Sequence, residues 1–294
     1  MKIVVAFGGL GNVLFYYALA NVFREKGVKS FVFVSKTNLE HRNYDLFTIF
    51  PHLSKWGNLN AIQKIYYLIL QTIRNFRYKR YKIPHKYLFY PFEGLYYDQE
   101  PVYYIPSIFK ELEKNQYLIG HFQSYKFFYD YKDSILKEFQ FSQNNLSEKT
   151  KKMEEVIGCS NSICIHVRRG DYLNGYYYET LGKVCSMDYY KRAVEYIRET
   201  IEDPKFFVFS DDPEYVALNL QIQDAIYVDF NKGSDSWQDM YLMSRCKHNI
   251  IANSTFSWWG AWLNDNPQKI VVAPSRWFAN MDNDEIVPPE WIRL

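Results

Sequence analysis

Two adjacent arginines carry the clearest chemical signal in this sequence. Arg168 and Arg169 follow the short apolar run 163–167 and stand just before Asp171. The run is too short for a helix and is typical of a strand buried on both faces. Because open parallel sheets bind ligands past the carboxyl ends of their strands, two guanidinium groups there could hold the oxygens of a diphosphate. The alternative is a surface arginine pair before a turn, with Asp171 as its salt-bridge partner.

Two further groups of polar residues follow expected strands in the second half of the chain. They are Ser210, Asp211 and Asp212, and then Asn253, Ser254, Thr255 and Ser257. In a parallel sheet, all three polar groups point to the same edge. The last group begins a helix, so its N–H groups and hydroxyls would face an anion placed there. Together with an arginine fork, this makes a diphosphate site that needs no metal ion.

Asp239 is a candidate for reading a guanine base. Its carboxylate could accept hydrogen bonds from the N1–H and amino groups of guanine. The alternative is a structural role as the acidic member of a capping box with Ser236, three residues earlier. The spacing alone leaves both interpretations open.

A glycine-rich turn near the start of the chain is a third candidate ligand site. Gly9, Gly11 and Asn12 lie between an expected strand at 3–7 and an expected helix at 13–26. Glycines there let a phosphate or a sugar approach the backbone N–H groups at the helix start. The turn matches neither the dinucleotide-binding pattern nor a Walker A loop, so a tight strand-to-helix turn is the alternative.

The elements that must position these residues alternate between strand and helix. In the second half, strands are expected at 163–167, 205–209, 225–229, 249–252 and 269–273, with helices between them. This alternation predicts a parallel, doubly wound sheet. The first half opens with a β-α-β pattern and is less regular over 40–150. The sequence therefore predicts an α/β fold with two Rossmann-like domains, at 1–155 and 156–294.

The composition restricts the class of protein. The chain has 294 residues, 48% of them hydrophobic, and a net charge of +2, which argues against wholesale nucleic-acid binding. Its cysteines form no CxxC pair, and we expect reduced, buried thiols in a cytoplasmic protein. The one Asp-x-Asp match, at 282–284, does not follow a strand, so we interpret it as a turn rather than a metal site.

One basic segment of the sequence could place the protein at a membrane surface. Residues 74–86 hold six Arg or Lys and no acid, interleaved with aromatic residues. Such a segment could touch an anionic membrane face, which would make the protein peripheral to the inner membrane, and a solvated basic face is the alternative. The chain contains no apolar run of 18 residues, so no membrane span is expected.

Four motifs taken together resemble the α-1,2-fucosyltransferase family, which includes bacterial galactoside 2-α-L-fucosyltransferases. They are GGLGN at 8–12, HVRRGDY at 166–172, SDDPE at 210–214 and IIANSTFSWWGAWL at 250–263. More distantly, they are similar to α-1,6- and protein O-fucosyltransferases. The resemblance follows the order of the whole chain, and it departs at Val13, where the family usually has Gln. It covers 40–150 poorly, so acceptor choice is little constrained.

The resemblance implies a GT-B fold with two Rossmann-like domains facing a cleft. It implies GDP-β-L-fucose as donor, a galactose-terminated glycan as acceptor, inversion at the anomeric carbon and no metal cofactor. Carried over by position, Arg168 would hold the β-phosphate, and His166 and Asp239 would read guanine and ribose. The remaining donor-side residues would be Arg169, Asp211, Asp212, Asn253, Ser254, Thr255, Phe256 and Ser257, with Gly9, Gly11 and Asn12 from the glycine turn.

The expected reaction is transfer of L-fucose to O2 of a terminal galactose in a surface glycan such as an O-antigen, or in an oligosaccharide. Arg168 and the helix start at Ser254 would stabilise the departing diphosphate. Asp171 is the first candidate base and Glu179 the second, while Asp171 could instead orient an arginine. Three rivals remain: a GDP-sugar transferase with another linkage or donor, a sugar-nucleotide-binding protein without turnover, and a nicotinamide-dependent oxidoreductase.

Overall fold

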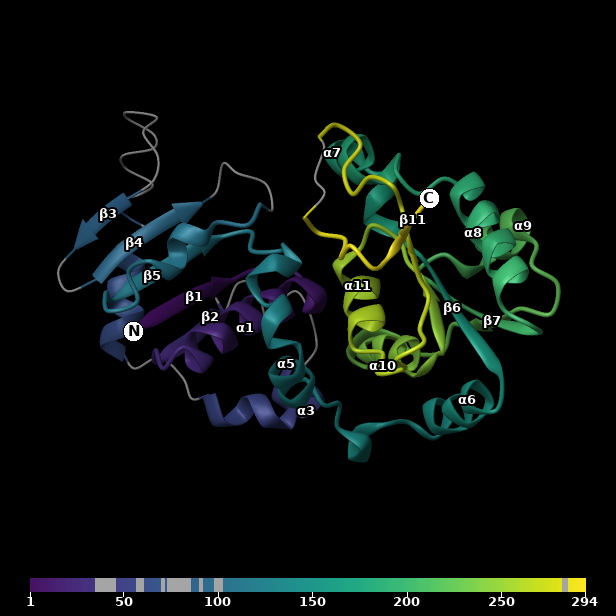
Figure 1. The fold of residues 1–294 in the computed structure, drawn as a ribbon, viewed down its shortest axis with the longest axis horizontal. Helices are drawn as coiled ribbons and strands as arrows, with labels where there is room; N and C mark the ends of the chain where they lie inside the picture. Colours follow the sequence, from purple (N-terminus) through teal and green to yellow (C-terminus); the bar gives the residue numbers. More distant parts are fainter. Residues whose placement is uncertain are drawn as a thin grey trace. The chain divides into compact units, whose positions relative to one another are not determined.

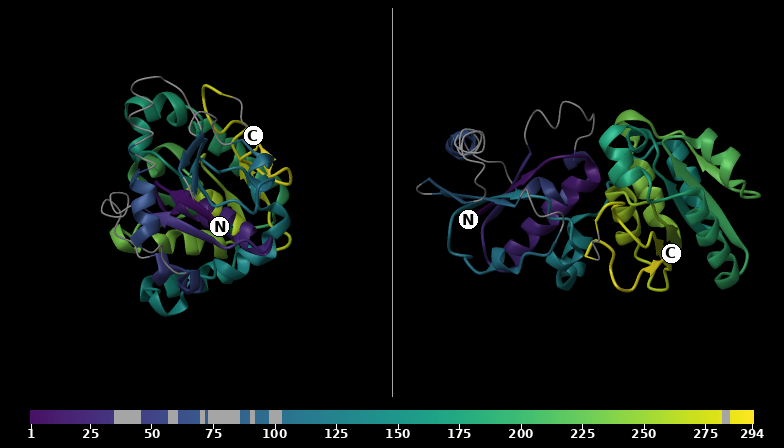
Figure 2. Two further views of the ribbon diagram at one scale, coloured as in Figure 1. Left: turned by 90° about the vertical axis from the view of Figure 1, so that its left-hand side faces the viewer. Right: turned by 90° about the horizontal axis from the view of Figure 1, so that it is seen from above.

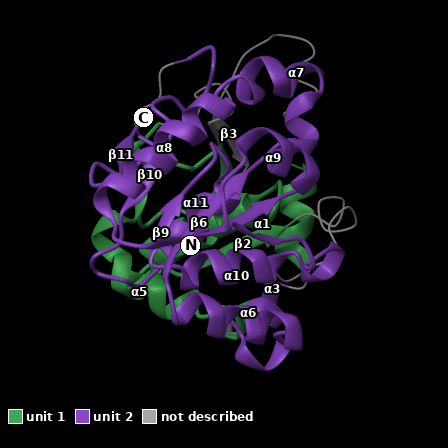
Figure 3. Ribbon diagram, turned by 90° about the vertical axis from the view of Figure 1, so that its right-hand side faces the viewer, with its two compact units in different colours: residues 1–42, 50–140 green, residues 43–49, 141–294 purple. Residues whose placement is uncertain are grey.

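Two α/β units form the chain in the computed structural model. The structure describes residues 1–34, 46–56, 61–69, 72, 86–89, 92–97, 103–281 and 285–294. Residues 1–42 and 50–140 make the first unit, and residues 43–49 and 141–294 make the second (Figure 1, Figure 3). Each unit is built around a mainly parallel sheet. These sheets confirm the α/β class and the two Rossmann-like units that the sequence predicts.

The first unit contains a five-stranded sheet in the order β2-β1-β5-β4-β3. Its elements are β1 (Lys2–Ala6), α1 (Leu10–Glu25), β2 (Ser30–Val34), β3 (Lys86–Phe89), β4 (Phe92–Tyr97), β5 (Gln116–Gly120) and α5 (Lys132–Glu138). All neighbouring strands are parallel except the antiparallel pair β3 and β4. Residues 61–69 are helical. The basic residues 74–85 lie outside the described part of the chain, as does the Asp-x-Asp match at 282–284.

The helix after β1 begins three residues earlier than expected, because the glycine turn is compact. Gly9 is the N-cap of α1, and Gly8 takes a φ of +88°, a conformation that L side chains rarely adopt. A Cβ at Gly8 would also lie 2.4 Å from the Asn12 amide nitrogen. The turn therefore requires glycine at position 8, which the sequence interpretation had not singled out.

The second unit contains a six-stranded sheet in the order β11-β10-β9-β6-β7-β8, with every neighbouring pair parallel. Its strands are β6 (Asn161–Val167), β7 (Pro204–Ser210), β8 (Ile226–Val228), β9 (His248–Ile250), β10 (Val271–Ala273) and β11 (Ile292–Arg293). Its helices are α3 (Leu46–Ile49), α6 (Glu148–Gly158), α7 (Gly175–Tyr177), α8 (Met187–Thr200), α9 (Pro213–Leu220), α10 (Trp237–Arg245) and α11 (Thr255–Trp262). Helices cover both faces of this sheet (Figure 2).

The boundary between the units falls after Gln140, earlier than the expected 155/156. Helix α6 therefore belongs to the second unit. Its Glu154 carboxylate accepts hydrogen bonds from the Tyr241 hydroxyl at 2.6 Å and from Arg245 Nε at 3.0 Å, both on α10. These long-range contacts, which sequence periodicity cannot show, join α6 to the second unit.

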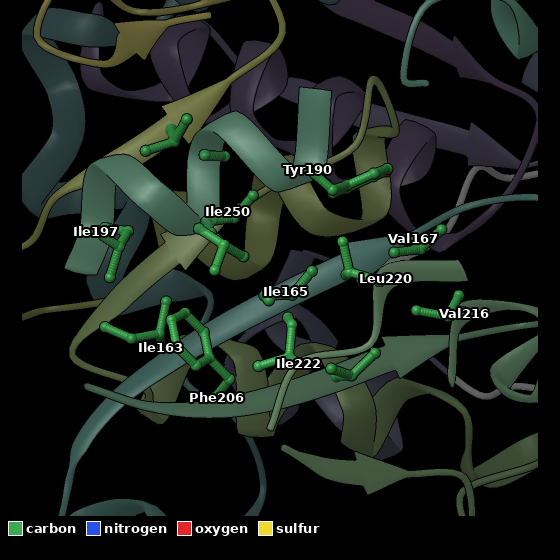
Figure 4. Packing of buried hydrophobic residues seen from close by; sticks show 14 of the residues in the cluster. Ile163, Ile165, Val167, Tyr190, Ile197, Phe206, Val216, Leu220, Ile222 and Ile250 are labelled. Carbon is green, nitrogen blue, oxygen red and sulfur yellow. The ribbon is translucent and has the colours of Figure 1, made fainter. Parts of the chain in front are cut away.

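Strand β6 separates the two sides of the second unit's core. Ile163, Ile165 and Val167 pack with Tyr190 and Ile197 of α8 in one buried cluster (Figure 4). The alternate residues of β6 point to the opposite face, since side chains alternate along a strand. This opposite face carries His166 and is covered by α10 and α11.

Helix α11 is almost wholly buried and is held by its tryptophans. Trp258 and Trp262 stack with ring centroids 5.0 Å apart, and Trp258 Nε1 donates to the Ile286 carbonyl at 2.8 Å. Gly260 packs so closely against α10 that an added Cβ would lie 2.8 Å from the Met243 Cβ. The tryptophans thus pack the core of the second unit.

The cysteines are free thiols in the structure, but one expectation about them was wrong. Cys164 and Cys246 are buried and Cys185 is partly buried, whereas Cys159 is exposed because it follows the end of α6. Within the described part of the chain, none of the helices combines the length and the apolar composition that crossing a bilayer requires.

Candidate functional site

The three polar groups predicted at strand ends lie at one edge of the second sheet. Strands β9, β6 and β7 are consecutive neighbours and all run parallel. In the register of β6 and β7, Val167 pairs with Ser210, so Arg168 and Asp211 leave their strands side by side. The parallel topology thereby brings together side chains that are distant in the sequence.

Arg168 is held between two carboxylates at this edge. Its Nη2 lies 2.8 Å and its Nε 3.0 Å from Asp171 Oδ1, and its Nη1 lies 2.9 Å from Asp211 Oδ2. The Arg168 side chain keeps 35% of its surface exposed. The guanidinium is therefore oriented by two acids and still accessible to an anion.

Arg169 makes a different set of contacts. Its guanidinium carbon lies 3.1 Å from the Tyr215 ring centroid, and its Nε donates to Asp212 Oδ2 at 2.9 Å. Asp212 in turn caps α9 by accepting from the Tyr215 N–H at 3.3 Å, with Pro213 at the first helical position. The Arg169 side chain thus joins the β6 turn to the start of α9 rather than standing open beside Arg168.

Gly170 allows Asp211 to approach the arginines. A Cβ at position 170 would lie 2.6 Å from Asp211 Oδ2, the oxygen that pairs with Arg168. Asp211 Oδ1 accepts the Arg169 backbone N–H at 2.9 Å. One carboxylate therefore fixes both the backbone of the turn and the Arg168 guanidinium, which requires a residue without a side chain between them.

Asn253 braces the loops around the site instead of facing an open position. Its amide nitrogen donates to the carbonyls of Leu181 and Trp277, each at 3.0 Å. Its side-chain oxygen accepts from the Cys185 thiol at 3.3 Å, and its backbone carbonyl accepts the Tyr172 hydroxyl at 3.0 Å. The Asn253 side chain is 2% exposed, so its role in the structure is to hold neighbouring loops in place.

The start of α11 presents the remaining residues of the last polar group. Ser254 is the N-cap, and its hydroxyl accepts the Phe256 N–H. The buried Ser257 hydroxyl donates to backbone carbonyls of the same turn. Thr255 and Phe256 are partly exposed, so they are the side chains of α11's first turn that reach the edge.

His166 lies buried on the α11 side of β6, with its ring 5.9 Å from the Phe256 ring. None of the described residues hydrogen-bonds its buried Nδ1. Burial, with the nearby Arg168 charge, lowers the pKa of His166 to about 3. The imidazole is therefore neutral at pH 7 and offers one donor and one acceptor.

Asp239 stands in the first turn of α10 and accepts a hydrogen bond from Asn231 Nδ2 at 2.9 Å. Burial raises the pKa of Asp239 to about 7, against the effect of that hydrogen bond and with a contribution from Asp229. The capping-box alternative was wrong, because Ser236 has helical backbone angles and its side chain makes no cap hydrogen bond. Asp239 is thus a partly buried carboxyl whose charge changes near neutral pH.

Two other predicted groups lie apart from these contacts. Glu179 is exposed and pairs with Lys183 at 2.6 Å, one helical turn along. Gly9, Gly11 and Asn12 belong to the first unit, where the Asn12 side-chain oxygen accepts from Gln123 Nε2 at 3.1 Å.

Four residues that the sequence interpretation did not assign complete the site: Gly170, Tyr172, Tyr215 and Asn231. Gly170 and Tyr172 stand within the HVRRGDY motif, so the motif itself was the available signal. Tyr215 and Asn231 act through contacts with residues of other elements, which have no local sequence signature.

The sequence profile described as "Glycosyl transferase family 11" matches residues 4–294. This chain belongs to glycosyl transferase family 11. The family is the one in which the α-1,2-fucosyltransferases are grouped, so the resemblance of the four motifs is confirmed. The two α/β units agree with the GT-B type of fold.

Curated relatives of this family 11 chain are named as sugar transferases. "O-antigen biosynthesis glycosyltransferase WbnK" of Escherichia coli is 40% identical over 187 residues, 62% of each chain. "Alpha-1,2-colitosyltransferase" of Escherichia coli is 36% identical over 180 residues, 60% of this chain and 61% of that one. "Galactoside alpha-(1,2)-fucosyltransferase 1" of Ateles belzebuth is 28% identical over 148 residues, 48% of this chain and 40% of that one. The matches thus span less than two thirds of these relatives.

Proposed function

We propose that this family 11 chain transfers L-fucose from GDP-β-L-fucose to O2 of a terminal galactose, with inversion at the anomeric carbon. The observation that carries the proposal is the family match over 4–294 combined with Arg168, an oriented and accessible guanidinium at a sheet edge. The names of two relatives include an α-1,2 linkage, and one of them names a galactoside acceptor.

Arg168 and the start of α11 would stabilise the leaving group. As the fucose–oxygen bond breaks, the sugar becomes oxocarbenium-like and negative charge grows on the β-phosphate of GDP. A guanidinium and a helix N-terminus bind that charge more strongly in the transition state than in the ground state. We propose that they neutralise the diphosphate in place of a metal ion.

His166, Asp239 and Phe256 would bind the guanosine part of the donor. A neutral imidazole with an unmatched buried nitrogen can hydrogen-bond a ribose hydroxyl or a base edge. Asp239, when ionised, can accept two hydrogen bonds from guanine, and the Phe256 ring offers an apolar face. Asp212, Arg169, Asn253 and Ser257 would support the site from behind, since their side chains bind the surrounding turns.

A carboxylate is needed to take the proton from the galactose hydroxyl, and Asp171 is the first candidate. Its side chain is 49% exposed and adjoins Arg168, where the diphosphate would lie. Glu179 is the second candidate. We expect Asp171→Asn to lower kcat by 10²–10⁴. GDP affinity should not fall in this variant, because Asp171 no longer competes with the diphosphate for Arg168. Glu179→Gln should have kcat close to that of the unaltered protein. Equal kcat values for Asp171→Asn and the unaltered protein would remove Asp171 as the base.

Transfer of a colitosyl residue is the second candidate function. It is favoured by the 36% identity to a protein named as an α-1,2-colitosyltransferase. Arg168 and the start of α11 would bind this donor in the same way, because they would contact the nucleotide diphosphate and not the sugar.

The experiment that tests the proposal supplies GDP-fucose and a galactose-terminated acceptor and follows GDP release. The linkage of the product is then read by NMR. The expected product carries fucose in α-1,2 linkage to galactose. Acceptor-dependent GDP release with a different linkage would replace the stated reaction, turnover restricted to a colitosyl nucleotide would favour the second candidate, and GDP binding without turnover would make the chain a binding protein. An O-antigen repeat is the first acceptor to try, given the name of one relative.

A further inference from the structure

Three consecutive tyrosines are exposed a few residues after Arg168, and the rings of Tyr176 and Tyr177 contact each other with centroids 6.0 Å apart. Tyr176, Tyr177 and Tyr178 are 75%, 51% and 42% exposed, and Leu173 beside them is 48% exposed. We call these four residues the tyrosine patch. Tyr176 and Tyr177 lie on α7 (Figure 1), Leu173 ends the 3-10 helix before it, and Tyr178 begins the π-helix after it. Large side chains gathered on a surface in this way commonly mark a binding site.

The backbone beneath the patch is firmly anchored although its side chains are exposed. Thr180 is 4% exposed, and its hydroxyl donates to the Tyr176 carbonyl at 2.9 Å. The Thr180 carbonyl accepts the Ala279 N–H at 2.9 Å, and the Leu181 carbonyl accepts from Asn253. The patch therefore presents its rings on a fixed support, which lowers the entropy cost of binding.

The local backbone also departs from ordinary helix geometry. Residues Tyr178–Gly182 form a π-helix, a rare form that is frequent at functional sites. Gly182 permits it, because a Cβ there would lie 2.2 Å from the Tyr172 carbonyl oxygen. The close approach ties the patch to Tyr172, whose hydroxyl reaches the β9 end of the site.

The patch follows the Arg168 turn directly in the chain. Leu173 and the tyrosines stand in the same β6–α8 connection as Arg168 and Asp171. Tyr172, the residue before Leu173, has its ring centroid 5.9 Å from the Arg168 guanidinium. The patch holds no charged residue, and the charges that follow it in the chain balance, because Glu179 pairs with Lys183 at 2.6 Å. A partner for this surface is therefore uncharged overall and has faces that fit aromatic rings.

We propose that the tyrosine patch binds the sugar rings that precede the terminal galactose in a neutral oligosaccharide acceptor. The apolar C–H faces of sugars pack on aromatic rings, while tyrosine hydroxyls hydrogen-bond the sugar hydroxyls at the rim. This inference rests on the proposed function, because it places the acceptor beside Arg168. The patch would then favour longer acceptors, whereas Arg168 and the start of α11 would bind the donor.

The test compares two acceptors on each variant: a methyl galactoside and a galactose-terminated tetrasaccharide. Tyr176→Ala and Tyr177→Ala should each raise KM for the tetrasaccharide by about tenfold, the effect of losing one aromatic stacking contact. KM for the methyl galactoside and for GDP-fucose should stay within about twofold, since neither reaches the patch. Tyr176→Phe keeps the ring and should recover most of the affinity. Leu218→Ala removes another exposed side chain, 72% exposed on α9, and serves as the matched control.

Saturation-transfer NMR with the same tetrasaccharide measures binding without turnover. Tetrasaccharide binding that depends on Tyr176 would support the patch even if GDP-fucose proved not to be the donor. An unchanged tetrasaccharide KM in both alanine variants, with normal transfer, would overturn the inference and leave the proposed reaction intact. Equal losses with both acceptors would also overturn it, because the patch would then act on the terminal sugar or on the fold.

Discussion

Single replacements of Arg168 and Arg169 should have different effects: one should lower the rate of transfer and the other the stability of the fold. The two are neighbours in the sequence, but Arg168 faces two carboxylates at the sheet edge while Arg169 lies on Tyr215. Arg168→Ala should lower kcat/KM for GDP-fucose by 10²–10³, about 3–4 kcal/mol of transition-state stabilisation. Its effect on the free energy of unfolding should stay below about 1 kcal/mol, because its ion pairs are partly exposed and such pairs contribute little.

Arg169→Ala should have the reverse profile. It removes an ion pair to Asp212 with side chains 20% and 36% exposed, and a guanidinium stacked 3.1 Å from a ring centroid. Discounting for exposure, the loss in the free energy of unfolding is about 2 kcal/mol. For a domain of this size, that loss lowers Tm by about 4–8 °C. Its kcat/KM, measured well below Tm, should fall by less than about tenfold.

Thermal unfolding measures Tm, and steady-state GDP release on the same preparations measures kcat/KM. Arg192→Ala is the matched control, since Arg192 makes an exposed pair with Asp188 at 3.1 Å on α8 and should change neither. The reasoning is refuted if Arg168→Ala keeps kcat/KM within about threefold of the unaltered protein. If Arg169→Ala loses as much kcat/KM as Arg168→Ala at unchanged Tm, the roles assigned to the two arginines are wrong.

Three further predictions concern the same site. Gly170→Ala should push Asp211 away from Arg168 and lower kcat/KM by about tenfold with circular dichroism unchanged; full activity would show that the turn can shift without loss. Because burial raises the pKa of Asp239 to about 7, GDP should bind about tenfold more tightly at pH 8 than at pH 6, and Asp239→Asn should abolish this dependence in calorimetry. The same raised pKa makes Asp239 favour the folded state below pH 4, and this contribution is lost as pH rises to about 7. Transfer should proceed at full rate in EDTA, and a strict need for Mn²⁺ would contradict the metal-free clamp.

The convergence of polar residues at one edge could be predicted from the sequence because it follows from topology. Apolar runs alternating with helical segments indicate parallel strands, and parallel strands place their carboxyl ends together. Arg168 and Asp211 could thus be expected as neighbours without any knowledge of their contacts. The cap of α9 by Asp212 was also predictable, since it depends on residues only three apart.

The different roles of the accessible Arg168 and the structural Arg169 could not be predicted in this way. It depends on Tyr215, whose ring meets Arg169 only after α9 has packed against the sheet. The same limit applies to Asp239: its spacing from Ser236 fits a capping box, but the tight turn Gly233–Asp235 leads Ser236 into the helix with φ −57° and ψ −22°. Local patterns specify elements, whereas the state of each polar group depends on contacts between elements.

The charges at the sheet edge determine what must happen when a diphosphate arrives. Arg168 and Arg169 face Asp171, Asp211 and Asp212, so the cluster carries one negative charge more than positive. A phosphate that binds the fork formed by Arg168 Nε and Nη2 must displace the carboxylate that now occupies it. Asp171 is the acid that can leave, because its side chain is 49% exposed against 26% for Asp211, which also holds the backbone of Arg169. Binding of the donor would therefore release the Asp171 carboxylate beside the reacting sugar, where a base is needed, and so the candidate base would become available when the donor is in place.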